Sequence, residues 1–134
     1  MSRRRWKKVS PSNFIRSEEI AVFSESSESM KKKVYICAPL GGNVEENLER
    51  VKEYTEYALK CGAAPVVPHF YALCLDDNDP KQRETGMQAG QSLLWFCDEM
   101  WIFGDELTDG MKEEIQFCKN MKIRMKKIRK MERR

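Results

Sequence analysis

Short apolar runs alternate with helix-periodic segments over residues 33–128, and this alternation limits the possible folds more than any other feature. The runs KVYICA, APVVP and DEMWIFG are short and β-rich, which is typical of buried strands in a parallel sheet. IRMKKI is a fourth candidate strand, although its charges weaken that prediction. A β-α-β-α-β-α-β order of this kind predicts an α/β fold with a parallel sheet and right-handed crossovers.

Cap signals place the three predicted helices. Asn43 is a suitable N-cap for the first helix, and Glu46 stands where a capping-box partner belongs. Asp79 caps the second helix, which we expect over residues 80–96 and which begins with proline. The third helix is expected over residues 111–121.

Composition divides the chain into a domain with two charged ends. Residues 1–30 predict a tail, in which residues 13–23 could form a short helix or strand. Residues 31–128 form the predicted domain, and residues 129–134 a basic C-terminal tail. Met30 directly precedes the first strand signal, so one hypothesis is that it is the natural start of the protein.

Charge is distributed unevenly, although the net charge is only +3. Residues 31–122 carry eleven basic and sixteen acidic side chains, whereas residues 123–134 carry seven basic and one acidic. A basic end of this kind can touch nucleic acid, but no basic patch interleaved with aromatic residues accompanies it. We therefore expect a solvated end and no nucleic-acid partner.

The cysteines indicate a reducing compartment. All five are far apart, most lie in apolar stretches, and none forms a CxxC pair, so we expect reduced thiols and a cytoplasmic protein. A zinc site needs closely spaced ligands, and the chain has one histidine. No apolar run approaches 18 residues and no secretory signal is present, so we expect no membrane partner.

Three segments follow the predicted strands and should meet at the carboxyl edge of the sheet, where ligands bind in such folds. They are PLGGN (39–43), PHFYALCLDDND (68–79) and GDELTDG (104–110). The backbone of Gly41 and Gly42 could cradle an anion or a sugar hydroxyl, or the two glycines could simply form the turn. The first segment matches neither GxGxxG nor GxxxxGK, so dinucleotide and Walker-type sites are excluded.

The second segment offers two further candidates. Asp76, Asp77 and Asp79 could together hold a divalent cation, but Asp79 is already explained as a helix cap and the spacing is not that of an EF-hand. His69 follows a strand end and could contact a ligand, or it could be an ordinary loop or core residue. We therefore expect no metal at this segment.

Two adjacent glutamates in the last helix differ in orientation. At 100° per residue, Met111, Ile115 and Cys118 share the face that packs on the sheet. Glu113 then points to solvent, and Glu114 lies at the border of the buried face, in the first turn. An acid there is favoured by the helix dipole alone, but a partly buried glutamate also suits a nucleophile or general acid.

The stretches VYICAPLGGNVEENLERVKEY, PVVPHFYALCLDDNDPKQRETGM and CDEMWIFGDELTDGMKEEI resemble the DUF4406 family of small bacterial and phage proteins. That family is similar to the nucleoside 2-deoxyribosyltransferase superfamily. The resemblance implies a flavodoxin-like, Rossmann-type three-layer fold with a four- to five-stranded parallel sheet. It implies a hydrolase or transferase of nucleotide metabolism, in which a glutamate attacks C1′ of the sugar and no metal or redox cofactor takes part.

Residue by residue, the resemblance implies that Glu114 is the catalytic glutamate and that Tyr35 lies beside it and the sugar. The substrate-binding residues it implies, together with those suggested by the edge segments, are Pro39, Gly41, Gly42, Asn43, His69, Asp77, Gly104, Asp109, Gly110 and Met111. It also implies a homo-oligomer, for which HFYALCL and SLLWF offer apolar interface residues.

The chain departs from the superfamily pattern at two places. Pro39 and Gly41 stand where the deoxynucleotide hydrolases carry a serine and an arginine for the 5′-phosphate. Gly90 stands where they carry an aspartate thought to act at the base, and Asp98 instead opens the third strand, where we expect it to cap or turn. Three functions remain open: an N-glycosidic-bond hydrolase or transferase, a non-catalytic module that binds a nucleotide or a nucleotide derivative, and a protein-interaction role that uses exposed aromatic residues and the basic ends.

Overall fold

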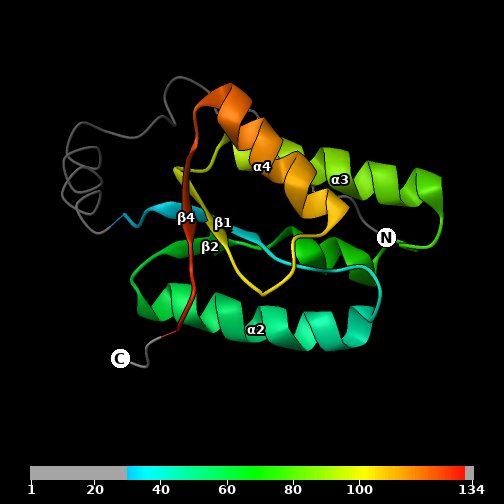
Figure 1. Cartoon of the computed structure of the whole chain (residues 1–134), viewed down its shortest axis with the longest axis horizontal. Helices are drawn as coiled ribbons and strands as arrows, with labels where there is room; N and C mark the ends of the chain where they lie inside the picture. The colour runs from blue at the N-terminus through cyan, green and yellow to red at the C-terminus, as the bar shows by residue number, and fades with distance from the viewer. Residues whose placement is uncertain (1–29, 132–134) are drawn as a thin grey trace, which may run out of the picture. The chain divides into compact units, whose positions relative to one another are not determined.

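The computed structural model describes residues 30–131 (Figure 1). The chain divides into two units, Met1–Met30 and Lys31–Arg134, and the α/β fold is that of the second. The predicted N-terminal tail, with its short helix or strand at residues 13–23, lies outside the described residues. Within the described part, no helix has the length and apolar character needed to cross a membrane.

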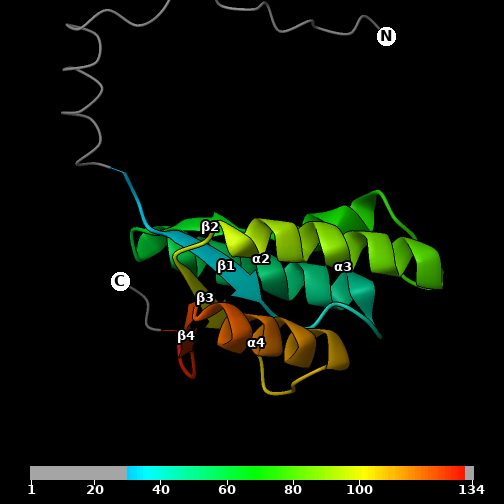
Figure 2. The same cartoon turned by 90° about the horizontal axis from the view of Figure 1, so that it is seen from above.

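Four parallel strands form one sheet in the order β2-β1-β3-β4, which confirms the predicted α/β class (Figure 2). The elements in chain order are β1 (Lys33–Cys37), α2 (Val44–Lys60), β2 (Ala64–Val66), η2 (Pro68–Leu73), α3 (Pro80–Trp95), β3 (Glu99–Ile102), α4 (Asp109–Met121) and β4 (Arg124–Lys127).

Helices cover both faces of the sheet, giving three layers (Figure 1). The strand β1 is central, and its side chains alternate between the two faces because successive residues of a strand point in opposite directions. Val34 and Ile36 pack on the side of α2, whereas Tyr35 and Cys37 pack on the side of α3 and α4. This alternation decides which β1 side chains can reach α4.

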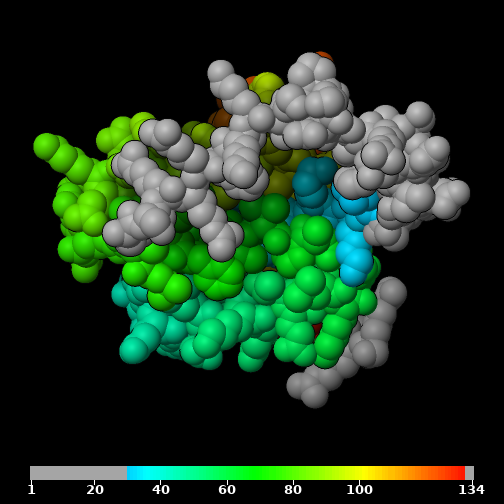
Figure 3. Space-filling view, turned by 180° about the vertical axis from the view of Figure 1, so that it is seen from behind, coloured from blue at the N-terminus to red at the C-terminus, as the bar shows by residue number. Residues whose placement is uncertain are grey.

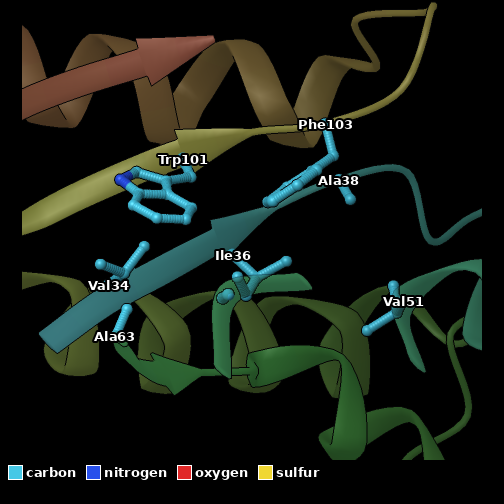
Figure 4. Packing of buried hydrophobic residues seen from close by; sticks show 8 residues of the cluster. Val34, Ile36, Ala38, Val51, Ala63, Trp101 and Phe103 are labelled. Atoms are coloured by element: carbon cyan, nitrogen blue, oxygen red, sulfur yellow. The ribbon is translucent and has the colours of Figure 1, made fainter. Parts of the chain in front are cut away.

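The core beneath α2 is apolar and partly aromatic (Figure 4). Val51 of α2 is fully buried in it together with Val34 and Ile36. Phe103 stacks on Tyr54 with ring centroids 4.6 Å apart, a favourable offset for an aromatic pair. This packing fixes α2 on the sheet, and Figure 3 shows α2 beside the β2–η2–α3 segment.

The helix caps follow the sequence closely. The Asn43 side chain caps α2 by accepting a hydrogen bond from the backbone N–H of Glu46 at 3.1 Å. The Glu46 carboxylate accepts from the Asn43 side-chain amide at 3.1 Å, in place of the backbone N–H that a full capping box uses. Asp79 caps α3 by accepting from Lys81 N at 3.0 Å, ahead of Pro80 in the first turn. Both predicted caps are therefore confirmed.

Two element boundaries differ from the sequence prediction. The segment expected to be a loop after β2 contains the 3-10 helix η2. The last helix begins at Asp109 rather than Met111, because the Thr108 hydroxyl accepts from Met111 N at 3.2 Å and caps it two residues earlier. Asp98 accepts from Lys33 N at 2.8 Å, so its side chain links the start of β3 to the start of β1 instead of capping a helix or closing a local turn.

The charged segment IRMKKI does form an edge strand. Met125 packs against the core on the α4 side, while Lys126 lies over the Trp101 ring at 5.4 Å from its centroid. Charged side chains on an edge strand discourage pairing with another sheet. The charged side chains are therefore compatible with an edge strand, and Lys126 also contacts an aromatic ring of the neighbouring strand.

Candidate functional site

A cavity of about 340 Å³ opens where the carboxyl ends of β1, β2 and β3 continue into loops and helices. It is bordered by the loop after β1, by η2, by α3 and by the first turns of α4. Its size lies in the usual range for small-molecule sites. The three segments singled out in the sequence all contribute to its walls.

Glu114 reaches this cavity from the second turn of α4. It is partly buried, whereas its neighbour Glu113 is exposed, in agreement with the helical projection. Buried Met111 and Cys118 hold the same helix face against the sheet, so the position of Glu114 is fixed by the packing of α4.

Two hydrogen-bond donors from β1 meet the Glu114 carboxyl. The Cys37 thiol lies 3.7 Å from Glu114 Oε1, and the Tyr35 hydroxyl also hydrogen-bonds to this carboxyl. Tyr35 and Cys37 are two residues apart on one strand, so both point to the same face of the sheet. A carboxyl group held between two donors has a defined position and orientation.

Burial and hydrogen bonding act in opposite directions on this carboxyl. Burial raises the pKa of Glu114 from 4.5 to about 7, while the hydrogen bonds from Tyr35 and Cys37 lower the pKa and limit the rise. Burial also raises the pKa of both donors, and the nearby Glu114 raises it further, so both keep their protons. At neutral pH, both the protonated and the ionised form of Glu114 are therefore populated.

Gly90 of α3 makes room for this arrangement. A Cβ at this position would lie 2.9 Å from the Tyr35 hydroxyl oxygen, closer than real Cβ contacts allow. Gly90 is buried, and it stands where the sequence comparison expected an aspartate. In this chain, the position provides space for the tyrosine in place of an acid.

His69 lies in the wall of the cavity and is 5% exposed. Its Nε2 is 2.9 Å from the carbonyl oxygen of Ala38, so Nε2 carries the proton and donates. Burial lowers the pKa of the ring, which favours the neutral form. Nδ1 then bears a lone pair, and within the described residues it has no hydrogen-bond partner.

The structure brings together most of the predicted site residues. Around the cavity lie Tyr35, Gly41, Gly42, His69, Asp77, Asp109, Gly110 and Glu114. Gly42 has φ +90°, which favours glycine and explains the second glycine of the first loop.

Four predicted binding residues, Pro39, Asn43, Gly104 and Met111, do not line the cavity. Asn43 is occupied with capping α2, and Met111 is 1% exposed in the core. Gly104 has φ +92° and lies against Pro39. The Cδ of Pro39 is 3.1 Å from the position that a Cβ on residue 104 would occupy. These two residues therefore shape the loops that surround the cavity.

Sequence reasoning missed the contribution of α3 to the cavity, and it did not single out Tyr71 of η2 or Thr108. Tyr71, Arg83, Met87 and Gln91 line it, together with Thr108. Arg83 and Met87 lie four residues apart on α3, so a helical projection from Gly90 would have found this face.

The three aspartates after η2 diverge. Asp76 accepts from Asn78 N, Asp79 caps α3, and Asp77 lies in the cavity wall. Across residues 30–131, no group of three or more His, Cys, Asp or Glu side chains is placed to hold a metal ion.

Comparisons with known proteins agree with the fold. The model of a family described as "Domain of unknown function (DUF7768)" matches residues 32–128. A 2-deoxyribosyltransferase from the psychrotolerant bacterium Bacillus psychrosaccharolyticus has a similar structure, with a TM-score of 0.57 and 16% identity over 71% of this chain and 70% of that one. At this identity, the likeness concerns the fold. No protein of curated description matches the chain.

The matching family model is DUF7768, whereas the sequence motifs were compared with DUF4406. The expected likeness to deoxyribosyltransferases is supported as a distant structural resemblance.

Gly90→Ala should destabilise the protein by about 1–3 kcal/mol, because the new methyl group meets the Tyr35 hydroxyl. The cost should shrink in a Tyr35→Phe background, which lacks that oxygen. Urea unfolding of the double-mutant cycle measures the coupling. Gly86→Ala, in the same helix, is the control, since its methyl group meets only the end of the Leu75 side chain. Equal costs in both backgrounds would contradict the predicted contact.

Glu114 should make stability fall as pH rises from about 4.5 to about 7. Between these values the unfolded chain ionises Glu114 while the folded protein keeps the proton, so the folded state binds more protons. Relative to Glu114→Gln, the wild type should lose about 1–3 kcal/mol over this window. Urea unfolding at several pH values measures this difference. Glu113→Gln changes an exposed position, so its curve of stability against pH should run parallel to that of the wild type. If the curve of Glu114→Gln were also parallel to that of the wild type, the assignment of this pH dependence to Glu114 would be refuted.

Proposed function

We propose a function for this chain, which belongs to the DUF7768 family: it cleaves the N-glycosidic bond of a nucleoside or nucleotide, as a hydrolase or a deoxyribosyltransferase. The observation that carries the proposal is the Glu114 carboxyl, which lies partly buried in the cavity wall between two hydrogen-bond donors. The fold relative, a deoxyribosyltransferase described as a biocatalyst for nucleoside synthesis, supports the same class of reaction.

In the proposed reaction, the ionised Glu114 carboxylate attacks C1′ of the sugar. The bond between C1′ and the base nitrogen breaks, its electron pair leaves with the base, and the base takes up a proton from solvent. Water or a second base then attacks C1′ and gives up a proton to solvent, the bond to Glu114 breaks, and the carboxylate is restored. Two displacements at C1′ give overall retention of configuration, as in retaining glycosidases.

The surroundings of Glu114 suit this role. A pKa of about 7 leaves a substantial fraction of the group ionised at neutral pH. Tyr35 and Cys37 remain protonated, so they orient the carboxylate by donating to it without competing as nucleophiles. We therefore propose Glu114 as the nucleophile and Tyr35 as the residue that holds it beside the sugar.

We expect the protein to release or exchange the base of at least one compound in a panel of deoxynucleosides, ribonucleosides and their monophosphates. Glu114→Gln should lower this activity by at least about 1000-fold, because it removes the nucleophile. Chromatography of the products, with and without a second free base, measures both hydrolysis and transfer.

Glu113→Gln is the matched control, with the same substitution one residue away on the exposed side of α4, and it should keep the activity. Turnover that survives in Glu114→Gln would contradict the proposal. No turnover, with a nucleotide still raising the melting temperature, would favour the binding module.

We further propose a homo-oligomer, supported by exposed apolar side chains at the carboxyl end of α3 and on η2. Phe96 is 72% exposed, and Trp95, Phe70 and Leu73 are also exposed. Such groups are common at the centre of interfaces. Sedimentation should give a mass of at least two chains, and Phe96→Asp should lower it. A wild-type mass of 15.7 kDa at micromolar concentration would contradict this expectation.

A further inference from the structure

We propose that the cavity selects a nucleoside without a 5′-phosphate and that Asp77 determines this selection. The inference rests on the proposed function, since it names the substrate class of the same site. It follows from the placement of Asp77, from the charges around the cavity and from the hydrogen-bonding character of its walls.

Asp77 lies in the segment between η2 and α3 and is partly buried. Its Oδ2 is 3.4 Å from the place that a Cβ on Gly41 would occupy, so the carboxylate lies directly against the glycine loop. Asp76 and Asp79 on either side serve local turns and caps. Within residues 30–131, the Asp77 side chain has no hydrogen-bond or ion-pair partner, which leaves it available to a ligand.

The glycine loop is where an anionic group would otherwise be expected. It precedes the N-terminus of α2, whose backbone N–H groups favour negative charge. A phosphate on this loop would face the carboxylate of Asp77, and two like charges at this range repel each other. Asp77 thus cancels the attraction that the loop and helix would offer.

The charged residues that line the cavity also disfavour a phosphate. Asp77, Asp109 and Glu114 line it, and Arg83 is the one lysine or arginine among the described lining residues. Arg83 also borders an adjoining hollow of about 450 Å³, in the company of Glu84 and Glu113. Carboxyl groups therefore outnumber basic side chains in this lining, which disfavours an anionic ligand.

Three groups of the wall can accept a hydrogen bond as carboxylates. These groups are the carboxyl groups of Asp77, Asp109 and Glu114. A sugar hydroxyl can donate to such groups, whereas a phosphate dianion can only accept. An unphosphorylated sugar therefore complements this wall, and a phosphorylated one does not.

Calorimetric titration in a Glu114→Gln background, which prevents turnover, tests the inference. The probes are the four common 2′-deoxynucleosides, each paired with its 5′-monophosphate. At least one deoxynucleoside should bind about 10-fold or more tightly than its monophosphate. Asp77→Asn should reduce this preference about 10-fold, mainly by improving monophosphate binding. The preference should also shrink at high salt, because charge causes it.

Asp76→Asn is the matched control, as it removes the same charge one residue away and keeps the oxygen that accepts from Asn78. It should leave the preference unchanged. Tighter binding of a monophosphate that is lost in Arg83→Gln would overturn the inference and assign a phosphate site to Arg83. A preference that Asp77→Asn does not alter, or the absence of binding by every probe, would also overturn it.

The two proposals can fail separately. Binding of a deoxynucleoside with the expected preference, but no turnover by the wild type, would refute the enzyme and leave the selection standing. Turnover of nucleosides and monophosphates with equal efficiency would support the enzyme and refute the role of Asp77.

Discussion

The burial of β1 on both faces is the constraint on which the rest of the structure depends. As the central strand, β1 must supply apolar side chains to the core beneath α2 and to the core beneath α3 and α4. Two of its four buried residues, Tyr35 and Cys37, also carry hydrogen-bond donors on the second face. A strand needed for folding therefore also places the groups that meet Glu114.

The Glu114 carboxyl is a compromise between two opposing effects. Removing a carboxylate from water costs free energy, and the two donors offset part of that cost. With less burial, the group would titrate like an ordinary surface acid; without donors, it would stay protonated at neutral pH. The compromise places its titration near neutral pH, where a carboxyl group can act as a nucleophile or transfer a proton.

Close approach of α3 completes the site, because a glycine at position 90 lets this helix lie against the Tyr35 hydroxyl. The same helix, with η2, brings apolar and polar side chains over the glycine loop and so encloses the cavity. The acidic residue that faces this loop, Asp77, comes from the segment joining the two elements. The enclosure of the cavity and the proposed charge selection thus share one structural origin.

Local signals in the sequence were sufficient to predict the α/β class, the four parallel strands, the caps of α2 and α3, and the outward direction of Glu113. These features could be predicted because strand alternation and helix capping depend on residues that are neighbours in the sequence. The predicted start of α4 was two residues too late, because the Thr108 hydroxyl caps the helix ahead of Asp109. Only the tertiary structure decided which residues meet in the cavity. It brought Arg83 and Gly90 of α3 to the wall, left Asn43 and Met111 out of it, and set Asp77 against Gly41. These contacts join segments far apart in the chain, and their distances depend on how closely helices pack on the sheet, which no local pattern encodes.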